Sequence, residues 1–326
     1  MAKSENQKLK LLAVLEHLKK YSDEENTVSV AEIIEALEKE GISAERKSIY
    51  TDIETLIDWG YDIVSVREGR RTGYFLASRE FETAELKLLV DAVQSSKFLS
   101  VKKSLELIKK LESLTSQSTA KTLRREMFVS GRVKTMNESV YYNIDAIHNA
   151  IFKNKKIGFL YFNYNRDKEK VLRREGKEYV VSPYSLIFED ENYYLLAYDS
   201  EEGILKHYRV DKMDKIKVKA EDREGREEFE KTNVAENAKM LFGMFGGREE
   251  LVTVKLNNNL AGAVIDRFGK SVAIRPADED SFYLTTRVKV SPQFFGWLAS
   301  FGKDAKIITP EEVRKEYEDH IREILK

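Results

Sequence analysis

The spacing of apolar residues changes from a helical period to a strand period near residue 140, and this change divides the chain into several domains. In the first 60 residues, apolar side chains recur every three to four positions, as at Leu11, Leu15 and Leu18. After residue 140, short aromatic and β-branched runs alternate with turn residues, as in 157–165 and 191–199. A chain of 326 residues is long enough for two or three ordinary cores. The pattern therefore predicts an α+β multidomain protein.

Residues 1–79 are predicted to fold as three helices followed by a β-hairpin. The expected helices cover residues 7–21, 30–40 and 44–59, and the expected strands cover residues 62–68 and 72–78. Ser29 and Ser43 stand where helix N-caps are expected. Gly41 and Gly60 follow the second and third helices, as glycines commonly do at helix C-termini. Three helices and a trailing hairpin describe a winged helix-turn-helix, whose last helix enters the DNA major groove.

The third expected helix has one apolar and one polar face. Its apolar side carries Ile49, Ile53, Leu56 and Ile57. The side chains expected to contact DNA are Arg46, Lys47, Ser48, Tyr50 and Thr51 in this helix and Arg67, Arg70 and Arg71 on the hairpin. Basic and hydroxyl side chains of these types bind phosphates and base edges. The competing interpretation is an ordinary solvated face, because residues 1–78 contain eleven basic and fifteen acidic side chains.

Residues 80–136 are expected to form a helical connector that packs against a neighbour or dimerises. Two amphipathic helices are predicted within 82–115, with apolar residues at Leu86, Leu89, Val90 and Val93 and at Leu105, Ile108 and Leu111. The formal net charge of the whole chain is −1, yet residues 97–134 carry ten basic and three acidic side chains. Residues 153–178 carry nine basic and four acidic side chains. The positive charge is therefore concentrated in the middle of the chain.

Residues 137–220 are predicted to form one helix and a small, strongly bent antiparallel sheet or barrel. The helix is expected over 143–155, and the strand-like runs cover 157–165, 177–190, 191–199 and 204–219. Glu189, Asp190 and Glu191 fall between two of these runs, so they are interpreted as a solvated hairpin turn. Residues 221–248 are interpreted as an acidic helical linker that includes the glycines of 242–247.

Residues 249–326 follow the element order β-α-β-β-α-β, which predicts a ferredoxin-like domain. The expected strands cover 251–256, 271–277, 282–290 and 305–309, and the expected helices cover 258–269 and 291–302. Pro310 fits the first turn of a further helix that ends the chain, because the fixed backbone angle of proline suits a helix start.

The composition excludes several kinds of site. The chain has no cysteine, which removes disulfides, thiolate metal sites and a cysteine nucleophile. Its four histidines lack metal-ligand spacing, and no phosphate-loop or nucleophile motif occurs. No signal peptide is visible at the N-terminus, and no apolar run approaches the roughly 20 residues that span a bilayer. We therefore expect a cytoplasmic protein without membrane contact that is not an enzyme and uses no metal or cofactor.

Three short motifs between residues 182 and 213 resemble the signatures of the WYL domain. They are Ser182-Pro183-Tyr184, Asn192-Tyr193-Tyr194-Leu195-Leu196-Ala197 and His207-Tyr208-Arg209-Val210-Asp211-Lys212-Met213, with Tyr193 at the position of the naming tryptophan. The run from Ile42 to Asp52 is similar to the recognition-helix motif of WYL-domain transcriptional regulators, which commonly carry Arg where this chain has Thr51. The resemblance covers nearly the whole chain, including a C-terminal extension domain.

The resemblance implies a bacterial transcriptional regulator whose WYL domain is an Sm-like β-barrel that senses a ligand. In several members of the family this ligand is thought to be a nucleic acid or nucleotide. The expected effector-binding residues are Tyr161, Ser182, Tyr184, Tyr193, His207 and Arg209. Aromatic faces beside cations are the usual means of binding single-stranded nucleic acid.

Three of the residue assignments in this segment have alternatives. Arg209 can bind a phosphate or pair with the nearby Asp211, and a lone histidine such as His207 is commonly a structural hydrogen-bonding residue. Tyr193 and Tyr194 point to opposite faces of a strand, and Tyr194 is the one expected in the core.

Two functions are compatible with these patterns. The first is a ligand-responsive regulator that binds double-stranded DNA as a homodimer, because helix-turn-helix dimers bind paired half-sites. The second is an accessory protein that binds RNA or single-stranded DNA through the barrel, with the winged helix contacting another protein. The acidic balance of residues 1–78 and Thr51 keep the second function open.

Overall fold

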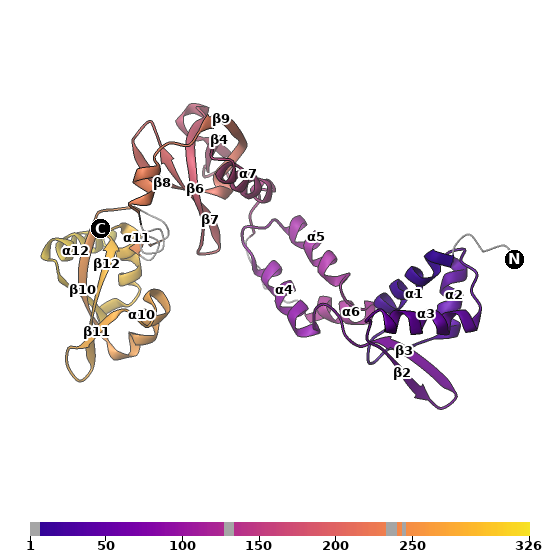
Figure 1. The fold of residues 1–326 in the computed structure, drawn as a ribbon. Helices are drawn as coiled ribbons and strands as arrows, with labels where there is room; N and C mark the ends of the chain where they lie inside the picture. The colour runs from indigo at the N-terminus through magenta and orange to yellow at the C-terminus, as the bar shows by residue number, and fades with distance from the viewer. Residues whose placement is uncertain (1–6, 127–133, 233–239, 243–245) are drawn as a thin grey trace. The chain divides into compact units, whose positions relative to one another are not determined.

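The computed structural model describes residues 7–126, 134–232, 240–242 and 246–326. These residues fold into two units, Met1–Glu138 and Ser139–Lys326. The first unit combines helices with a small sheet, and the second contains two further sheets with their helices (Figure 1). A mixed, multidomain fold of α and β elements is therefore present, as the change of apolar period predicts.

Three helices and a small sheet form the N-terminal part of the first unit. The helices are α1 (Gln7–Tyr21), α2 (Val30–Lys39) and α3 (Arg46–Asp58). Ser29 caps α2 as predicted, and it forms a capping box in which the Ser29 hydroxyl and the Glu32 carboxylate each accept a backbone N–H of the other residue. The cap predicted at Ser43 is wrong. Helix α3 begins two residues later than expected, with Glu45 at the N-cap position.

The buried faces of the three helices form one core. Its fully or nearly fully buried side chains include Val14, Leu18, Ile33, Ile49 and Ile53. Ile57, predicted on the buried face of α3, is 45% exposed. The other three residues predicted on this face, Ile49, Ile53 and Leu56, are buried, so the buried face of α3 is narrower than the sequence pattern indicates.

A hairpin projects from the three helices (Figure 1). It consists of β2 (Ile63–Glu68) and β3 (Arg71–Leu76), and the two-residue β1 (Val28–Ser29) pairs with β3 to complete a sheet of order β1-β3-β2. Glu68 is paired with Arg71 in the last register position, so Gly69 and Arg70 form the turn. Gly69 has a φ of +63°, which glycine adopts without the steric cost of a Cβ atom.

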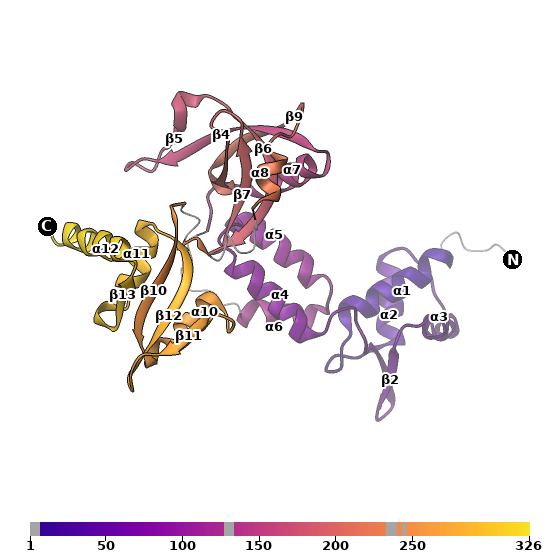
Figure 2. The same cartoon turned by 60° about the vertical axis from the view of Figure 1, so that its left-hand side comes forward.

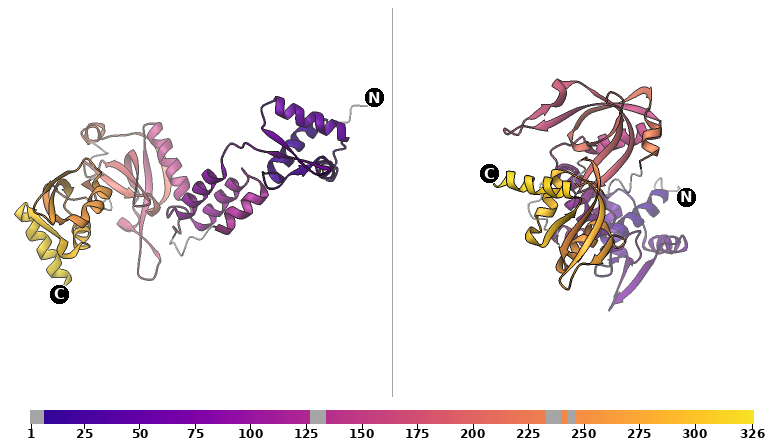
Figure 3. Two further views of the ribbon diagram at one scale, coloured as in Figure 1. Left: turned by 90° about the horizontal axis from the view of Figure 1, so that it is seen from below. Right: turned by 90° about the vertical axis from the view of Figure 1, so that its left-hand side faces the viewer.

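The described residues of the connector form three helices, whereas two were predicted from the sequence. They are α4 (Thr83–Ser95), α5 (Val101–Glu112) and α6 (Gln117–Glu126), and they lie side by side (Figure 3). Helix α6 was missed because its described part buries little more than Leu123, so it shows no apolar period. Leu89 and Leu105, expected on packed faces, are exposed.

The second unit begins with a helix and a curled six-stranded sheet. The elements are α7 (Val140–Phe152), β4 (Lys155–Tyr164), β5 (Lys170–Leu172), β6 (Tyr179–Glu189), β7 (Asn192–Asp199), β8 (Ile204–Arg209) and β9 (Met213–Asp222). The strands pair in the order β5-β4-β6-β7-β8, and β9 also pairs with β4. Asp190 and Glu191 form the β6–β7 turn with positive φ, whereas Glu189, predicted in the same solvated turn, ends β6 and forms an ion pair of 3.4 Å with Arg267.

Irregular pairing bends this sheet into half a barrel (Figure 2). The β4–β9 ladder shifts register twice, and the β6–β7 ladder shifts once between Pro183 and Ser185. Such bulges increase local twist and bend a strand. The structure thus shows a strongly curled sheet, as predicted, but it does not by itself identify the sheet as the Sm-like barrel that the family resemblance implies.

The C-terminal part of the chain has the predicted ferredoxin-like order. Its elements are β10 (Glu249–Asn257), α10 (Ala261–Phe268), β11 (Ala273–Pro276), β12 (Ser281–Lys289), α11 (Pro292–Ala299), β13 (Ala305–Thr309) and α12 (Glu311–Ile324). The sheet order is β11-β12-β10-β13, and all three pairings are antiparallel. This order places the first and third strands of the motif at the centre.

Short helical turns complete the chain. They are η1 (Arg173–Gly176), η2 (Val210–Lys212), α8 (Arg226–Glu230), η3 (Asn258–Leu260) and η4 (Gly302–Asp304). Within the described residues, the helices are all too short or too polar to cross a membrane.

Candidate functional site

The exposed surface of α3 presents two basic side chains that form no ion pair with any described residue. Arg46 Nε donates a hydrogen bond to the Tyr50 hydroxyl at 3.1 Å, and its guanidinium lies 5.9 Å from the Tyr50 ring centroid. Lys47 is exposed on the same turn. The Ser48 and Thr51 hydroxyls donate to the carbonyls of Glu45 and Lys47, so these two side chains are held against the helix backbone.

The three hairpin arginines predicted to contact DNA differ in their surroundings. Arg71 forms an ion pair of 2.8 Å with Glu32 and donates to the carbonyl of Thr27, so it fastens the hairpin to the start of α2. Arg67 donates to the carbonyl of Gly69, and Arg70 is exposed at the tip. Arg67 and Arg70 form no ion pair with any residue that the structure describes.

A buried ion pair, which was not predicted from the sequence, joins α1 to α3. Lys10 is 3% exposed, and its Nζ lies 2.9 Å from Asp52 Oδ2. Removing two charges from water is costly unless they neutralise each other. The pair therefore places α3 against α1 and compensates the negative charge of Asp52 on the helix that carries Arg46 and Lys47.

Ser182 and Tyr184, predicted to bind an effector, both contact the segment that follows β9. The Glu224 backbone N–H donates to the Ser182 hydroxyl at 2.9 Å, and the Tyr184 hydroxyl donates to the Glu224 carbonyl at 2.8 Å. Both residues are buried. Their hydroxyl groups thus satisfy the backbone N–H and carbonyl of Glu224 in the segment that follows β9.

The Tyr184 ring is also covered by that segment. The Phe229 ring of α8 is stacked on it, and Arg223 Cζ lies 4.7 Å from its centroid. Burial raises the pKa of the Tyr184 phenol, which therefore stays protonated and keeps its hydrogen bond at neutral pH.

Tyr161 and Arg209 form a second group within the half-barrel. The Arg209 backbone N–H donates to the Tyr161 hydroxyl at 3.1 Å. The Arg209 guanidinium donates to both carboxylate oxygens of Asp211, at 3.0 and 2.9 Å, and to Asn192 Oδ1 at 2.9 Å. Of the two roles open to Arg209, the structure therefore shows the internal ion pair.

His207 lies on β8, two residues before Arg209. In the β7–β8 register it faces Leu196, and Arg209 faces Tyr194. Burial lowers the pKa of His207 below its ordinary value of 6.5, so its imidazole is neutral at neutral pH. The imidazole has no hydrogen-bond partner within the described residues, which leaves one donor and one acceptor for a ligand.

The two neighbouring tyrosines of β7 point to different environments. Tyr194 is buried against Leu241, as the sequence predicted for the core member of the pair. Tyr193 is half-buried and contacts the Phe188 ring with 4.9 Å between centroids. Tyr193 therefore lies near the β6–β7 turn. It does not take part in the hydrogen bonds that connect Ser182 and Tyr184 to Glu224.

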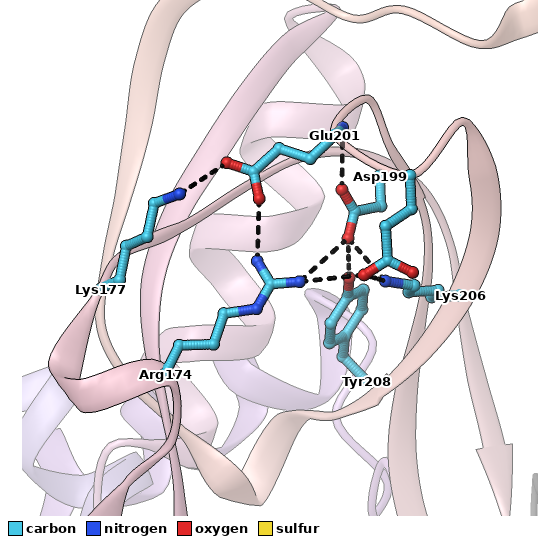
Figure 4. Close-up of polar contacts among 7 residues, drawn as sticks. Arg174, Lys177, Asp199, Glu201, Lys206 and Tyr208 are labelled. Atoms are coloured by element: carbon cyan, nitrogen blue, oxygen red, sulfur yellow. Dashed lines mark hydrogen bonds and ion pairs between the residues drawn. The ribbon is translucent and has the colours of Figure 1, made fainter.

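A charged cluster on the same domain was not predicted as a unit (Figure 4). Its centre is Asp199, which is 2% exposed and accepts hydrogen bonds from Lys206 Nζ at 2.8 Å and from the Tyr208 hydroxyl at 3.2 Å. Arg174 completes the cluster by pairing with Glu201 at 3.0 Å and with Glu202 at 3.1 Å. The cluster ties the η1 turn to the β7–β8 turn.

The ionisation of this cluster favours the folded state. Burial acts to raise the pKa of Asp199, but hydrogen bonds from Lys206, Glu201 N–H and Tyr208 outweigh it and hold that pKa below its ordinary value. Burial and the Asp199 charge raise the pKa of Tyr208. Arg174 and Lys206 are thus occupied by carboxylates, and we assign them a structural role. Within the described residues, no three His, Cys, Asp or Glu side chains are grouped so as to hold a metal ion.

Two family models match the second unit. The WYL domain model matches residues 142–218, and the WCX domain model matches residues 248–325. This chain contains a WYL domain and a WCX domain. The resemblance based on its three short motifs is therefore confirmed. The WYL domain comprises most of α7 and the curled sheet, and the WCX domain comprises the ferredoxin-like part.

Two solved structures overlap with this WYL-domain protein at low similarity. Proteasome accessory factor B/C (PafBC) of Arthrobacter aurescens is 17% identical, with a TM-score of 0.27, and the match covers 96% of this chain and 48% of that one. A CRISPR Cas-related protein is 16% identical, with a TM-score of 0.39, covering 99% of this chain and 86% of that one. This chain thus spans about half the length of the PafBC chain. Among curated proteins none matches significantly.

Proposed function

We propose that this WYL-domain protein is a transcriptional regulator that binds double-stranded DNA and responds to a nucleic acid or nucleotide effector. The observation that carries the proposal is the set of basic side chains on α3 and the hairpin that no described carboxylate neutralises: Arg46, Lys47, Arg67 and Arg70. They lie on a domain whose element order is that of a winged helix-turn-helix. Such cations bind phosphates and orient the helix on DNA.

The acidic balance of residues 1–78 does not count against this surface. Several of the acidic side chains are already paired with cations of the same domain, including Asp52 with Lys10, Glu32 with Arg71 and Glu35 with Lys39. Because exposed charges beyond about 10 Å are largely screened at 0.1 M salt, the local charge of α3 and the hairpin governs DNA contact.

The proposed effector site is centred on His207 of the WYL domain. His207 presents a neutral imidazole two residues before Arg209, whose guanidinium pairs with Asp211 and whose backbone N–H donates to the Tyr161 hydroxyl. A half-buried group with an unused donor and acceptor discriminates ligands by hydrogen bonding. We propose no catalytic step for this site.

We further propose that the protein binds DNA as a homodimer, because helix-turn-helix dimers bind paired half-sites.

The DNA-binding part of the proposal is tested by salt-dependent affinity. The probe is double-stranded DNA from the region upstream of the protein's own gene, and the variant is Lys47→Gln with Arg70→Gln. Each lost phosphate contact should make the slope of log K against log salt shallower by about 0.9. Lys110→Gln, an exposed lysine of α5, is the control for a change of charge alone. An unchanged slope in the folded double variant would remove α3 and the hairpin from the DNA interface.

A second candidate is an accessory protein that binds RNA or single-stranded DNA through the WYL domain, and it is favoured by Thr51, which stands where WYL-domain regulators commonly carry Arg. The same variant separates the two functions. If the protein is the accessory protein, substitution of Lys47 and Arg70 leaves its affinity for every nucleic acid unchanged. Substitutions in the WYL domain then weaken its binding to single-stranded RNA or DNA.

A further inference from the structure

Two lysines of the WYL domain converge on the same pair of aromatic rings. Lys170 Nζ lies 4.4 Å from the Phe162 ring centroid, while Lys212 Nζ lies 4.5 Å from that of Tyr164 and 5.7 Å from that of Phe162. The two rings are themselves in edge contact, with 5.5 Å between centroids. We call these four residues the lysine–aromatic patch.

The fold brings the two lysines together from separate elements. Lys170 on β5 is paired with Tyr164 on β4, and Leu172 is paired with Phe162, so Lys170 lies on the face of the hairpin that carries both rings. Figure 2 shows β5 and the end of β4 projecting as an arm from the half-barrel. Lys212 ends the η2 turn, directly before the fully buried Met213. Phe162 is fully buried, so the ring that both lysines approach is held in place by the surrounding core.

The positive charge of the patch is not neutralised by the surrounding protein. Neither ammonium group forms an ion pair with a carboxylate of the described chain. The acidic group that acts on Lys212 is Asp211, and both of its oxygens already accept hydrogen bonds from Arg209. Glu169, next to Lys170 in sequence, accepts a hydrogen bond from Asn165 Nδ2.

Burial makes the ammonium form of Lys212 less favourable, and two neighbouring cations act in the same direction. Burial lowers the pKa of Lys212, and the positive charges of Arg209 and Lys170 lower it further, against the opposite effect of Asp211. Like charges held close together are repulsive, and a bound anion would relieve this repulsion for both lysines at once.

We propose that Lys170 and Lys212 form a binding site for a phosphate group of the effector, a single-stranded nucleic acid or a nucleotide. Each ammonium has three N–H donors, and the several oxygens of one phosphate can accept from both lysines. Lysine is a common phosphate ligand because it acts as a compact point charge. The inference rests on the proposed effector binding and adds the position at which the phosphate is held.

The site is tested by binding of labelled single-stranded (dT)12 to the full chain across a range of salt concentrations. The variant is Lys170→Gln with Lys212→Gln, and the control is Lys217→Gln, an exposed lysine of β9 in the same domain. For single strands, the loss of two phosphate contacts should weaken binding and make the log–log salt slope shallower by about 1.4. Titration with ADP provides the nucleotide arm, and polyglutamate provides an acidic-peptide arm.

The outcomes separate this inference from the proposed function. Reduced affinity for (dT)12 or for ADP in the double variant, with the Lys217 control unchanged, supports the phosphate site and tells which source of phosphate it takes. Binding of either probe with equal affinity and slope in wild type and double variant would overturn the site and leave effector binding intact. Binding of polyglutamate alone, or of no probe at all, would also overturn it.

A single-lysine comparison guards against unfolding of the double variant. Lys170→Arg and Lys212→Arg keep the charge, so each should retain the salt slope of the wild type. If either of these variants, which keep the positive charge, showed a shallower slope of log K against log salt, charge alone would not explain phosphate binding by the patch.

Discussion

Phe229 is stacked on Tyr184, with 4.5 Å between the ring centroids and 18° between the ring planes. Tyr184 belongs to a motif that resembles a ligand-binding signature, yet its ring and hydroxyl are both engaged by the segment of residues 223–229. That segment leads out of the WYL domain toward the WCX domain. Tyr184 and Ser182 therefore anchor the exit of the chain from the half-barrel.

Substitution of Phe229 by Ala is expected to loosen this anchor. An aromatic pair contributes about 0.5–1.5 kcal/mol beyond the area that it buries. The Glu224 N–H, which donates to Ser182, should then exchange its hydrogen faster, as measured by hydrogen–deuterium exchange. Glu227→Ala, an exposed residue of the same helix, is the control. Unchanged exchange at Glu224 in Phe229→Ala would mean that the two hydrogen bonds hold the segment without the stack.

Substitution of Lys10 by Met is expected to destabilise the N-terminal domain. The change leaves Asp52 as an uncompensated charge among apolar residues, which typically costs about 3–5 kcal/mol. Urea unfolding should show a lower midpoint, and adding Asp52→Asn to the variant should recover part of the loss. Lys19→Met, which breaks the exposed pair with Glu16, is the comparison and should cost at most about 1 kcal/mol. Equal effects of the two substitutions would refute the buried pair.

Stability is expected to fall on mild acidification because of His207. Its pKa in the folded protein lies below the ordinary value of 6.5, so the unfolded chain binds the proton first as the pH falls. The contribution of the neutral imidazole is thus complete above pH 6.5 and is lost progressively below it. His207→Gln should flatten this part of the stability profile, measured by urea unfolding at several pH values. His148→Gln, at an exposed position of α7, provides the reference.

Arg70 and Arg71 are neighbours in sequence but are expected to contribute differently to DNA binding. Arg70→Gln removes a cation without an ion-pair partner among the described residues, so the salt slope should become shallower by about 0.9. Arg71→Gln breaks the pair with Glu32, so its main effect should be on the stability of the hairpin. Equal salt slopes for the two variants would contradict this division of roles.

Local signals were sufficient to predict much of the fold. Ser29 and Glu32 are three residues apart, so the capping box that starts α2 is visible in the sequence. The strands of the WCX domain were predicted because their apolar and polar residues alternate over several positions. The signal failed for α6, which is mostly polar and is helical because it packs beside α4 and α5.

The candidate sites were predicted less completely, because a charged or polar side chain can bind a ligand or pair with another residue of the protein, as Arg209 does with Asp211. The motifs identified Ser182, Tyr184, His207 and Arg209 as one set, but the contacts separate an anchoring pair from a group around Tyr161. Lys170 lies outside the three motifs, and Lys212, although it is part of the third motif, was not predicted as a site residue. Their shared position depends on the β4–β5 register and on the placement of η2.

The order of the helices and strands and the WYL signatures can thus be read from the chain, because apolar period, capping residues and turn residues act over a few positions. The nearly balanced charge of the chain is likewise a property of its composition. Which charges remain available to nucleic acid depends on tertiary structure. Ion pairs join residues as distant in sequence as Glu32 and Arg71 or Lys10 and Asp52, and only folding brings such groups within a few ångströms of each other.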